Sequence, residues 1–294
     1  MKKLLRLLLI LLTLIPVGCV PALTNPATNA ATDSATRPSP AATRVVALTP
    51  ITADIIHRLA PTRLVGMSGS QLLNQNETFK AIPRVSQGRT QPNLEKIVAL
   101  EPDLVIGAVG FHDQVLEKLR SLGIKTIATE LDSWRSLEEL TRTLATAIQA
   151  APDPLLQRYQ QCLPSQSRQG NNSTLVLVSR QPLLAPNKAS WAGDLLKQFG
   201  AVNLVAQLQG QSPVKGYVTL SPEKVLQANP DILILVNAEG GNTDEFKSEP
   251  FWKDLKAVQN DRVYVLDYYG FVNAGSIDAI TQACTQLKRI YKIN

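Results

Sequence analysis

The sequence feature that most constrains the fold is an internal repeat. The segment "NLEKIVALEPDLVI" at residues 93–106 returns as "SPEKVLQANPDILI" at residues 221–234, so that Glu95 corresponds to Glu223, 128 positions later. In both copies an apolar pattern with helical spacing is broken by Pro-Asp before a β-branched run, which indicates a helix followed by a strand. A chain that carries this unit twice is predicted to fold into two similar halves.

The segments around each copy extend the repeat. A β-branched opening strand lies 50 residues before Glu95, at Val45, and another lies 48 residues before Glu223, at Leu175. Through both halves strands alternate with helical patterns, which indicates parallel sheets wrapped by helices. We therefore predict an α/β fold of two similar lobes with mainly parallel sheets.

The lobes are expected at residues 44–132 and 173–294, joined by a helical connector at residues 133–172. Within the connector, apolar residues at helical spacing mark one amphipathic helix; "APDP" interrupts it, and a short second helix stops before Pro164. In open α/β sheets, ligands bind at the carboxyl ends of the strands. We therefore predict a ligand cleft between the lobes, with small lobe movements because a helical joint bends less easily than a pair of strands.

Residues 1–18 read as an export signal. Basic residues precede an apolar run that is too short to cross a membrane, since a spanning helix needs roughly 20 apolar residues. The stretch before Cys19 resembles a bacterial lipoprotein processing site, although Pro16 stands where Leu is usual; ordinary cleavage after residues 20–22 is the alternative. Residues 19–43, rich in Ala, Thr and Pro, predict a disordered tether. Lipidation at Cys19 would place the protein in the periplasm or at the outer face of the cytoplasmic membrane.

Charge and cysteine content narrow the class of protein. Without residues 1–18 the chain keeps 27 basic and 24 acidic residues, and a net charge of +3 is too mild to indicate a nucleic-acid partner. Cys162 and Cys284 remain once Cys19 is assigned to the lipid, and an exported protein can join them in one disulfide. Two buried free thiols are the alternative, since Cys284 falls on the apolar face of a final helix. The sequence leaves both alternatives open.

The loops at the expected cleft carry an unusual share of cations and aromatic side chains. Arg89 lies six residues before Glu95, and Tyr217 lies six before Glu223, so the lobes would offer a guanidinium and a phenol at matching places. Each side chain alone could be an ordinary exposed loop residue, but a set converging on one cleft favours ligand binding. The set comprises Thr49, Pro50, Arg89, Phe111, His112, Arg180, Trp191, Lys215, Tyr217, Tyr269 and Phe271, with Lys188 and Tyr268 in the same loops.

Catalytic and metal sites find little support. The chain has two histidines, of which His57 fits the flank of a helix and His112 follows a strand end. A zinc or manganese site would need several converging His and carboxylate ligands. A P-loop, a nucleophile elbow and an H-E-x-x-H motif are also missing. We expect neither an enzyme nor a resident cofactor or metal.

Several segments, in order, are similar to the periplasmic binding proteins that serve iron–siderophore and vitamin B12 ABC importers. The resemblance runs from about Arg44 to Leu287 and is most specific in "PRVSQGRTQPNLEKIVALEPDLVIG", "LLAPNKASWAGDLLKQFGAVNLV" and "SPEKVLQANPDILIL". It implies two lobes on a helical backbone, a monomer, and one carboxylate per lobe that docks on the dimeric membrane permease. By motif position these carboxylates are Glu95 and Glu223. Arg89 and Tyr217 fall where such proteins place ligand-facing side chains.

The resemblance also ranks the ligands and leaves rivals. It implies a ferric chelate first, cobalamin second and haem third. Asn273 stands near the place where relatives often carry an arginine in the last cleft loop, and Pro164 shortens the second connecting helix. We count Asn273 among the predicted ligand-binding residues. The rival functions are an enzyme or metallocofactor-handling protein on the same plan, and a surface scaffold or sensor that has lost transport.

Overall fold

The computed structural model describes residues 40–88, 90–165, 170–209, 212, 214–237 and 243–293. The export signal, Cys19, most of the tether and Arg89 lie outside the described residues. The folded part begins slightly earlier than predicted, because Ala42 is buried and its amide donates to the Ala147 carbonyl at 2.8 Å. In the described ranges no helix combines the length and the apolar character that a membrane crossing requires.

The N-terminal lobe is built on one parallel sheet in the order β2-β1-β3-β4. All three residues of β1 are buried, and β1 pairs with β2 on one side and β3 on the other. The strands are β1 (Val45–Ala47), β2 (Leu64–Met67), β3 (Leu104–Ala108) and β4 (Lys125–Thr129). The helices are α1 (Pro50–Leu59), α2 (Gln71–Asn74), α3 (Leu94–Ala99) and α4 (Asp113–Ser121), with 3-10 turns at Pro61–Arg63 and Glu77–Phe79.

The C-terminal lobe repeats this plan. Its parallel sheet has the order β11-β10-β5-β8, which in both lobes places the first strand between the second and the third. The strands are β5 (Ser173–Leu177), β8 (Val202–Asn203), β10 (Ile232–Asn237) and β11 (Val263–Asp267). The helices are α7 (Trp191–Gln198), α8 (Pro222–Ala228), α9 (Lys256–Gln259), α10 (Tyr268–Phe271) and α11 (Ile277–Tyr291), with 3-10 turns at Thr243–Ser248 and Trp252–Asp254. The α/β fold with two similar parallel sheets is confirmed.

The aspartate of the repeated Pro-Asp accepts equivalent hydrogen bonds in both lobes. Asp103 accepts hydrogen bonds from the amide and hydroxyl of Thr43, both at 2.7 Å, just before β1. Asp231 accepts from the amide and hydroxyl of Ser173, both at 2.9 Å, at the start of β5. Each aspartate therefore ties the strand that follows it to the beginning of the lobe's first strand, which explains why Pro-Asp stands in both copies.

A small antiparallel sheet in the C-terminal lobe was not predicted. β7 (Leu183–Pro186) pairs with β6 (Ser179–Arg180) and with β9 (Tyr217–Leu220), in segments for which the sequence predicts cleft loops. The strands are two to four residues long; Pro182 directly precedes β7, and Pro186 is its last residue. Such short, proline-flanked runs give almost no strand signal.

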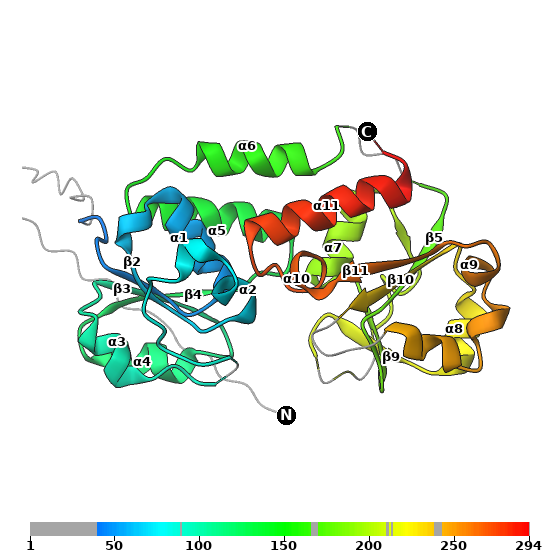
Figure 1. Ribbon diagram of the computed structural model, residues 1–294, viewed down its shortest axis with the longest axis horizontal. Coiled ribbons are helices and arrows are strands. Elements are labelled where there is room, and N and C mark those ends of the chain that lie inside the picture. Colours follow the sequence, from blue (N-terminus) through cyan, green and yellow to red (C-terminus); the bar gives the residue numbers. More distant parts are fainter. Residues whose placement is uncertain are drawn as a thin grey trace, which may run out of the picture. The chain divides into compact units, whose positions relative to one another are not determined.

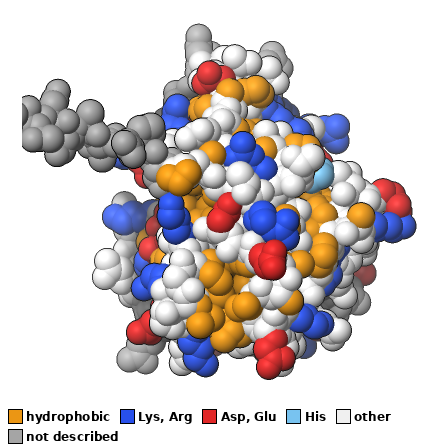
Figure 2. Space-filling model, turned by 90° about the vertical axis from the view of Figure 1, so that its left-hand side faces the viewer, with side chains coloured by type: hydrophobic (Ala, Val, Ile, Leu, Met, Phe, Trp, Pro, Cys, Tyr) orange, Lys and Arg blue, Asp and Glu red, His pale blue; other side chains and the backbone are white. Residues whose placement is uncertain are grey.

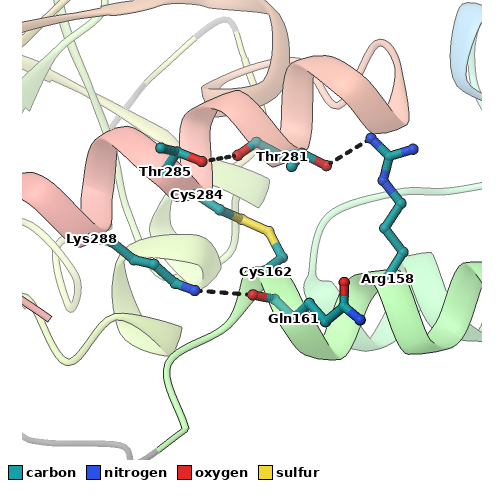
Figure 3. Close-up of a pocket in the computed structure, with 7 residues that line it drawn as sticks. All are labelled: Arg158, Gln161, Cys162, Thr281, Cys284, Thr285 and Lys288. Atoms are coloured by element: carbon teal, nitrogen blue, oxygen red, sulfur yellow. Dashed lines mark hydrogen bonds between the residues drawn. A yellow bond between two sulfur atoms is a disulfide. The ribbon is translucent and has the colours of Figure 1, made fainter. Parts of the chain in front are cut away.

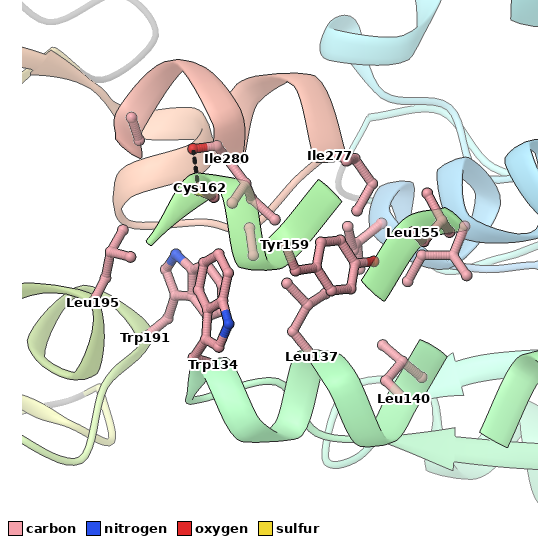
Figure 4. Packing of buried hydrophobic residues seen from close by; sticks show 14 of the residues in the cluster. Trp134, Leu137, Leu140, Leu155, Tyr159, Cys162, Trp191, Leu195, Ile277 and Ile280 are labelled. Atoms are coloured by element: carbon pink, nitrogen blue, oxygen red, sulfur yellow. Dashed lines mark hydrogen bonds between the residues drawn. The ribbon is translucent and has the colours of Figure 1, made fainter. Parts of the chain in front are cut away.

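Helices join the two lobes. The connector contains α5 (Trp134–Ala147) and α6 (Asp153–Cys162), and α6 contacts both α5 and the last helix, α11 (Figure 1). Between these helices lies an aromatic core in which Trp134 stacks on Trp191 with ring centres 5.9 Å apart (Figure 4). Beside them, the buried Tyr159 hydroxyl bonds the Thr141 hydroxyl at 2.9 Å. The core is therefore continuous from the connector into the C-terminal lobe.

The structure contains the Cys162–Cys284 disulfide, one of the two alternatives that the sequence left open. It joins the end of α6 to the middle of α11 across a sequence separation of 122 residues. Both cysteines are also buried, as the apolar spacing around Cys284 indicated. The disulfide therefore fastens the connector to the last helix of the chain.

Candidate ligand cleft and docking surface

At the end of β1, Thr49 and Pro50 start helix α1. Thr49 is the N-cap residue, its hydroxyl lies 2.7 Å from that of Thr52, and Pro50 takes the first helical position, where proline is well tolerated. Both are half-buried. The Thr49 hydroxyl is thus engaged in the helix start, and what this corner offers a ligand is a small polar rim.

At the end of β3 the two predicted residues have opposite exposures. Phe111 is 50% exposed and meets the ring of His112 edge-on. His112 is only 4% exposed and its Nδ1 accepts from the Ala108 amide at 2.9 Å, so the ring is neutral. Burial also lowers the pKa of His112, which favours the same neutral form. Phe111 is therefore available to a ligand, whereas His112 closes the turn after β3.

The Gln91 side chain links this corner to the neighbouring loop. Its amide nitrogen donates to the carbonyl of Phe111 at 3.3 Å. Gln91 therefore lies beside the turn that follows β3, whereas Arg89 is outside the described residues. The matching guanidinium predicted for this lobe remains a prediction.

Most of the predicted cations already have acceptors. Arg180 forms salt bridges with Glu245 and Glu249, both at 3.3 Å. Lys188 donates to the side-chain oxygen of Gln207 at 2.7 Å. Both contacts lie within the C-terminal lobe; the two glutamates offset the charge of Arg180, whereas the neutral Gln207 leaves that of Lys188 in place.

Lys215 is different because its partner belongs to the other lobe. Its ammonium lies 2.5 Å from a carboxylate oxygen of Glu130, just after β4, and both side chains are exposed. The hydrogen bond to Glu130 raises the pKa of Lys215. Gly216 fixes the turn beside Lys215: its φ is +80°, and a Cβ there would lie 2.7 Å from the Ala189 carbonyl oxygen. The pair joins the two lobes, from the carboxyl end of β4 in one to the turn before β9 in the other.

The prediction that Trp191 and Phe271 face a ligand is wrong. Trp191 is 4% exposed, and its indole donates to the Gly270 carbonyl at 2.9 Å; Phe271 is fully buried. Trp191 begins α7, which packs on α5, and Phe271 ends α10, which packs on α11, so both rings fill the core. A signal for Trp191 was present, because Trp191, Leu195 and Phe199 recur at intervals of four residues, the spacing of a buried helix face.

Tyrosines provide the aromatic surface that remains. Tyr217, Tyr268 and Tyr269 are half-buried, and the last two rings meet edge-on at 5.4 Å. Burial, with a smaller contribution from Tyr268, raises the pKa of Tyr217, so its phenol stays protonated at neutral pH. Asn273 is exposed, and its backbone N–H donates to the Tyr268 carbonyl at 3.0 Å. Tyr217 and Tyr268 are thus close enough to interact, and Asn273 belongs to the same corner as Tyr268.

A cavity of about 250 Å³ lies elsewhere, over the disulfide between α6 and α11 (Figure 3). Arg158 and Lys288 stand at its two ends, and both are engaged: Arg158 with Asp278, and Lys288 with the Gln161 carbonyl. Since no parallel strand ends there, this cavity is not the cleft that the fold predicts. The described part of the chain contains no cluster of three His, Cys, Asp or Glu side chains suited to a metal ion.

Glu95 and Glu223 occupy equivalent helix starts. Asn93 caps α3 by accepting from the Lys96 amide at 2.8 Å, and Ser221 caps α8 by accepting from the Lys224 amide at 3.3 Å. Each glutamate is thereby held in the first turn, where the helix dipole favours a carboxylate. Both are exposed, and a hydrogen bond with Ser221 lowers the pKa of Glu223.

Comparison with known proteins supports the family on independent grounds. The family model described as "Periplasmic binding protein" matches residues 45–269. The chain is 27% identical over 267 residues to the Fe(3+)-citrate-binding protein YfmC of Bacillus subtilis (strain 168), covering 84% of this chain and 81% of the relative. It is 25% identical over 228 residues to the high-affinity heme uptake system protein IsdE of Staphylococcus aureus (strain Newman), covering 72% and 75%.

A solved structure supports the fold. The periplasmic vitamin B12 binding protein BtuF of Vibrio cholerae superposes with a TM-score of 0.63 at 24% identity, covering 85% of this chain and 98% of that one. The family match spans both parallel sheets and both glutamate-bearing helices. The chain therefore belongs to the periplasmic binding protein family.

Proposed function

We propose that this protein is an extracytoplasmic solute-binding lipoprotein that captures a ferric chelate and delivers it to an ABC importer, without catalysis. The observation that carries the proposal is the family match across the whole two-sheet repeat, together with relatives that are themselves binding or uptake proteins. The ferric-citrate-binding relative, which the chain matches over 84% of its length, supports a ferric chelate as the ligand. The IsdE and BtuF relatives make haem and cobalamin the alternatives.

The cleft chemistry supports an anionic ligand with an apolar or aromatic part. Lys215 stands exposed at the strand ends, and the ring of Phe111 is half exposed on the other lobe. The half-buried phenol of Tyr217 adds a protonated donor. Charge-assisted hydrogen bonds from such groups to oxyanions are roughly twice as strong as neutral ones. Arg89 is predicted to be a second ligand-facing cation in the N-terminal lobe.

The test is isothermal titration of the purified full-length chain with ferric citrate, haemin and cyanocobalamin, with citrate alone as the control. Heat is the better readout than fluorescence, because Trp134 and Trp191 are buried. Tight binding of ferric citrate but not of citrate supports the proposal, and binding should weaken at high salt. Tight binding of cyanocobalamin with no response to either iron compound would reassign the ligand.

Delivery and anchoring have tests of their own. Glu95→Gln and Glu223→Gln should leave ligand affinity and fold unchanged while each lowers uptake, and the double variant should abolish it, because the exposed carboxylates orient the encounter with the permease. The mass of the protein extracted from membranes should show an acylated Cys19. Normal uptake by the double variant would reduce the glutamates to helix caps.

A further inference from the structure

Two exposed apolar side chains occupy the same place in the two copies of the repeat. Val98, on α3, is 40% exposed, and Leu226, on α8, is 41% exposed. Each stands three residues after the glutamate of its copy, Glu95 or Glu223, and the two are 128 positions apart, as the glutamates are. The structure thus presents a carboxylate and an apolar side chain together at two equivalent positions.

The buried neighbours fix how these helices are turned. Ile97 and Val225 are fully buried and point each helix's apolar face into its lobe. Residues three apart lie on the same face of a helix, about 60° apart around its axis, because successive residues turn by about 100°. Glu95 and Val98 are therefore neighbours on the solvent side of α3, and Glu223 and Leu226 are neighbours on that of α8. The lysine that follows each glutamate lies about 100° away around the axis.

The repeat does not by itself require an apolar residue at this position. The very next position differs in polarity between the copies, with Ala99 in one and Gln227 in the other. A single exposed apolar residue needs no explanation, but a pair kept apolar at equivalent exposed positions does. On the side of the N-terminal lobe shown in Figure 2, apolar side chains form small patches separated by charged residues. Val98 and Leu226 differ from a scattered pair because of their register with the glutamates.

We propose that Val98 and Leu226 complete two equivalent docking patches, each an apolar side chain beside a carboxylate, for a two-fold symmetric membrane permease that presents a cation next to an apolar recess on each half. The proposal rests on the proposed function. Exposed ion pairs contribute little net affinity, and their main effect is orientation and encounter rate. Burial of an apolar side chain at the centre of each patch supplies affinity that the glutamates alone lack. Two patches on one molecule make the second contact intramolecular once the first has formed.

The variants Val98→Thr and Leu226→Gln test this with little change of shape. Val202→Thr is the matched control, because Val202 is 39% exposed and lies on β8, outside both helices. All variants are made in the full chain, checked by thermal melting and by titration with ferric citrate, haemin and cyanocobalamin, and then placed in the chromosome of the source strain. Uptake of the three labelled compounds is measured beside a deletion strain.

We expect each single variant to lower uptake at limiting protein by about three- to fivefold, the factor for one buried methylene-sized contact. The double variant should lose about tenfold or more, with unchanged ligand affinity and melting temperature, and Val202→Thr should match the wild type. Wild-type uptake by the double variant, in a strain where Glu95→Gln lowers uptake, would overturn the proposal and leave docking by charge alone. Equal uptake of all three compounds by the wild-type and deletion strains would instead overturn the proposed function, and the docking patches with it.

Discussion

The carboxylate of Asp54 accepts a hydrogen bond at 2.7 Å from the backbone amide of Ile277, which lies 223 residues later in the chain. Asp54 belongs to α1, the first helix of the N-terminal lobe, and Ile277 is the first residue of α11, the last helix of the C-terminal lobe. Asp54 is 2% exposed and also binds Arg58, which reaches on to Asp278 at 2.8 Å. A buried carboxylate of one lobe therefore caps a helix of the other.

The reverse contact also exists. Asp194, on α7 in the C-terminal lobe, accepts from the amide of Trp134 at 2.8 Å, and Trp134 is the first residue of α5, the helix that leaves the N-terminal lobe. The two contacts are equivalent. In each lobe the helix between the first and second strands of the parallel sheet, α1 or α7, carries the aspartate. That aspartate caps a helix after the other lobe's last strand, α11 or α5. Orphan amides at helix starts carry partial positive charge, so both contacts are favourable. The pair of caps holds the lobes at the connector side.

Removing these carboxylates should cost stability unequally. We expect Asp54→Asn to lower the free energy of unfolding by about 2–3 kcal/mol, because a charged acceptor is lost at a buried site and Arg58 keeps only one of its two carboxylate partners, Asp278. Asp194→Asn should cost about 1 kcal/mol, the range for a helix cap. Urea unfolding followed by circular dichroism measures both, with the exposed Glu117→Gln as control. An Asp54→Asn variant as stable as the control would show that the cap is dispensable.

The disulfide should stabilise the same region. It closes a loop with a sequence separation of 122 residues, and chain-entropy estimates for loops of this length are about 4–5 kcal/mol, with removal of native disulfides typically costing about 2–5 kcal/mol. The Cys162→Ala/Cys284→Ala double variant should therefore melt several degrees lower. Reductant should lower the melting temperature of the wild type but not of the variant. Free-thiol labelling of the denatured, unreduced protein would contradict the disulfide if it found two reactive cysteines.

The parts of the fold and of the candidate site that the sequence predicts are those with a local pattern. The two parallel sheets, the connector helices and the paired glutamates follow from periodicity and from the repeat, because each element carries its own signal in a few adjacent residues. The caps from Asp54 and Asp194 do not, since each depends on a contact across at least 60 residues. The sequence predicts exposure for Trp191 and Phe271 because both follow strand ends, whereas their rings fill the core between helices.

The hydrogen bonds accepted by Asp103 and Asp231 predict that acid lowers the stability of the fold. The hydrogen bond with Lys256, followed by those from Ser173, lowers the pKa of Asp231 to about 2, from 3.8 in the unfolded chain. A depressed folded pKa contributes stability above about pH 4 that is lost as the pH falls toward about 2. The pKa of Asp103 is lowered as well, since the hydrogen bonds from Thr43 and Arg44 outweigh the opposing effect of burial.

Urea midpoints at pH 7, 4 and 3 should therefore fall on acidification. Asp231→Asn should start less stable than the wild type at pH 7 and lose less between pH 4 and 3, because the proton-linked contribution is already gone. The exposed Asp254→Asn should follow the wild type. If the urea midpoints of the wild type and Asp231→Asn fall in parallel with pH, the contact between Asp231 and Ser173 does not depend on the ionised carboxylate.

The Lys215–Glu130 pair predicts how ligand and lobe contact compete. With Glu130 2.5 Å away, the charge of the Lys215 ammonium is partly neutralised. An anionic ligand that binds Lys215 must displace Glu130 or share the cation with it. Glu130→Gln should therefore raise the affinity for ferric citrate by about two- to fivefold and leave stability unchanged, since exposed ion pairs contribute little to folding. Lys215→Gln should weaken binding and flatten its salt dependence, because screening acts on the charge that has been removed.

Calorimetric titrations at low and high salt distinguish these effects. Arg135→Gln is the matched control, because Arg135 is exposed and pairs with Glu139 within α5 rather than across the lobes. It should leave affinity and salt dependence as in the wild type. Lower affinity in Glu130→Gln would mean that the pair holds the lobes in the binding geometry, since the gain from a freed Lys215 would then be smaller than the loss of that contact. Equal affinities in all four proteins would place the ligand away from Lys215, and the anion-binding part of the cleft would have to be sought beside Phe111.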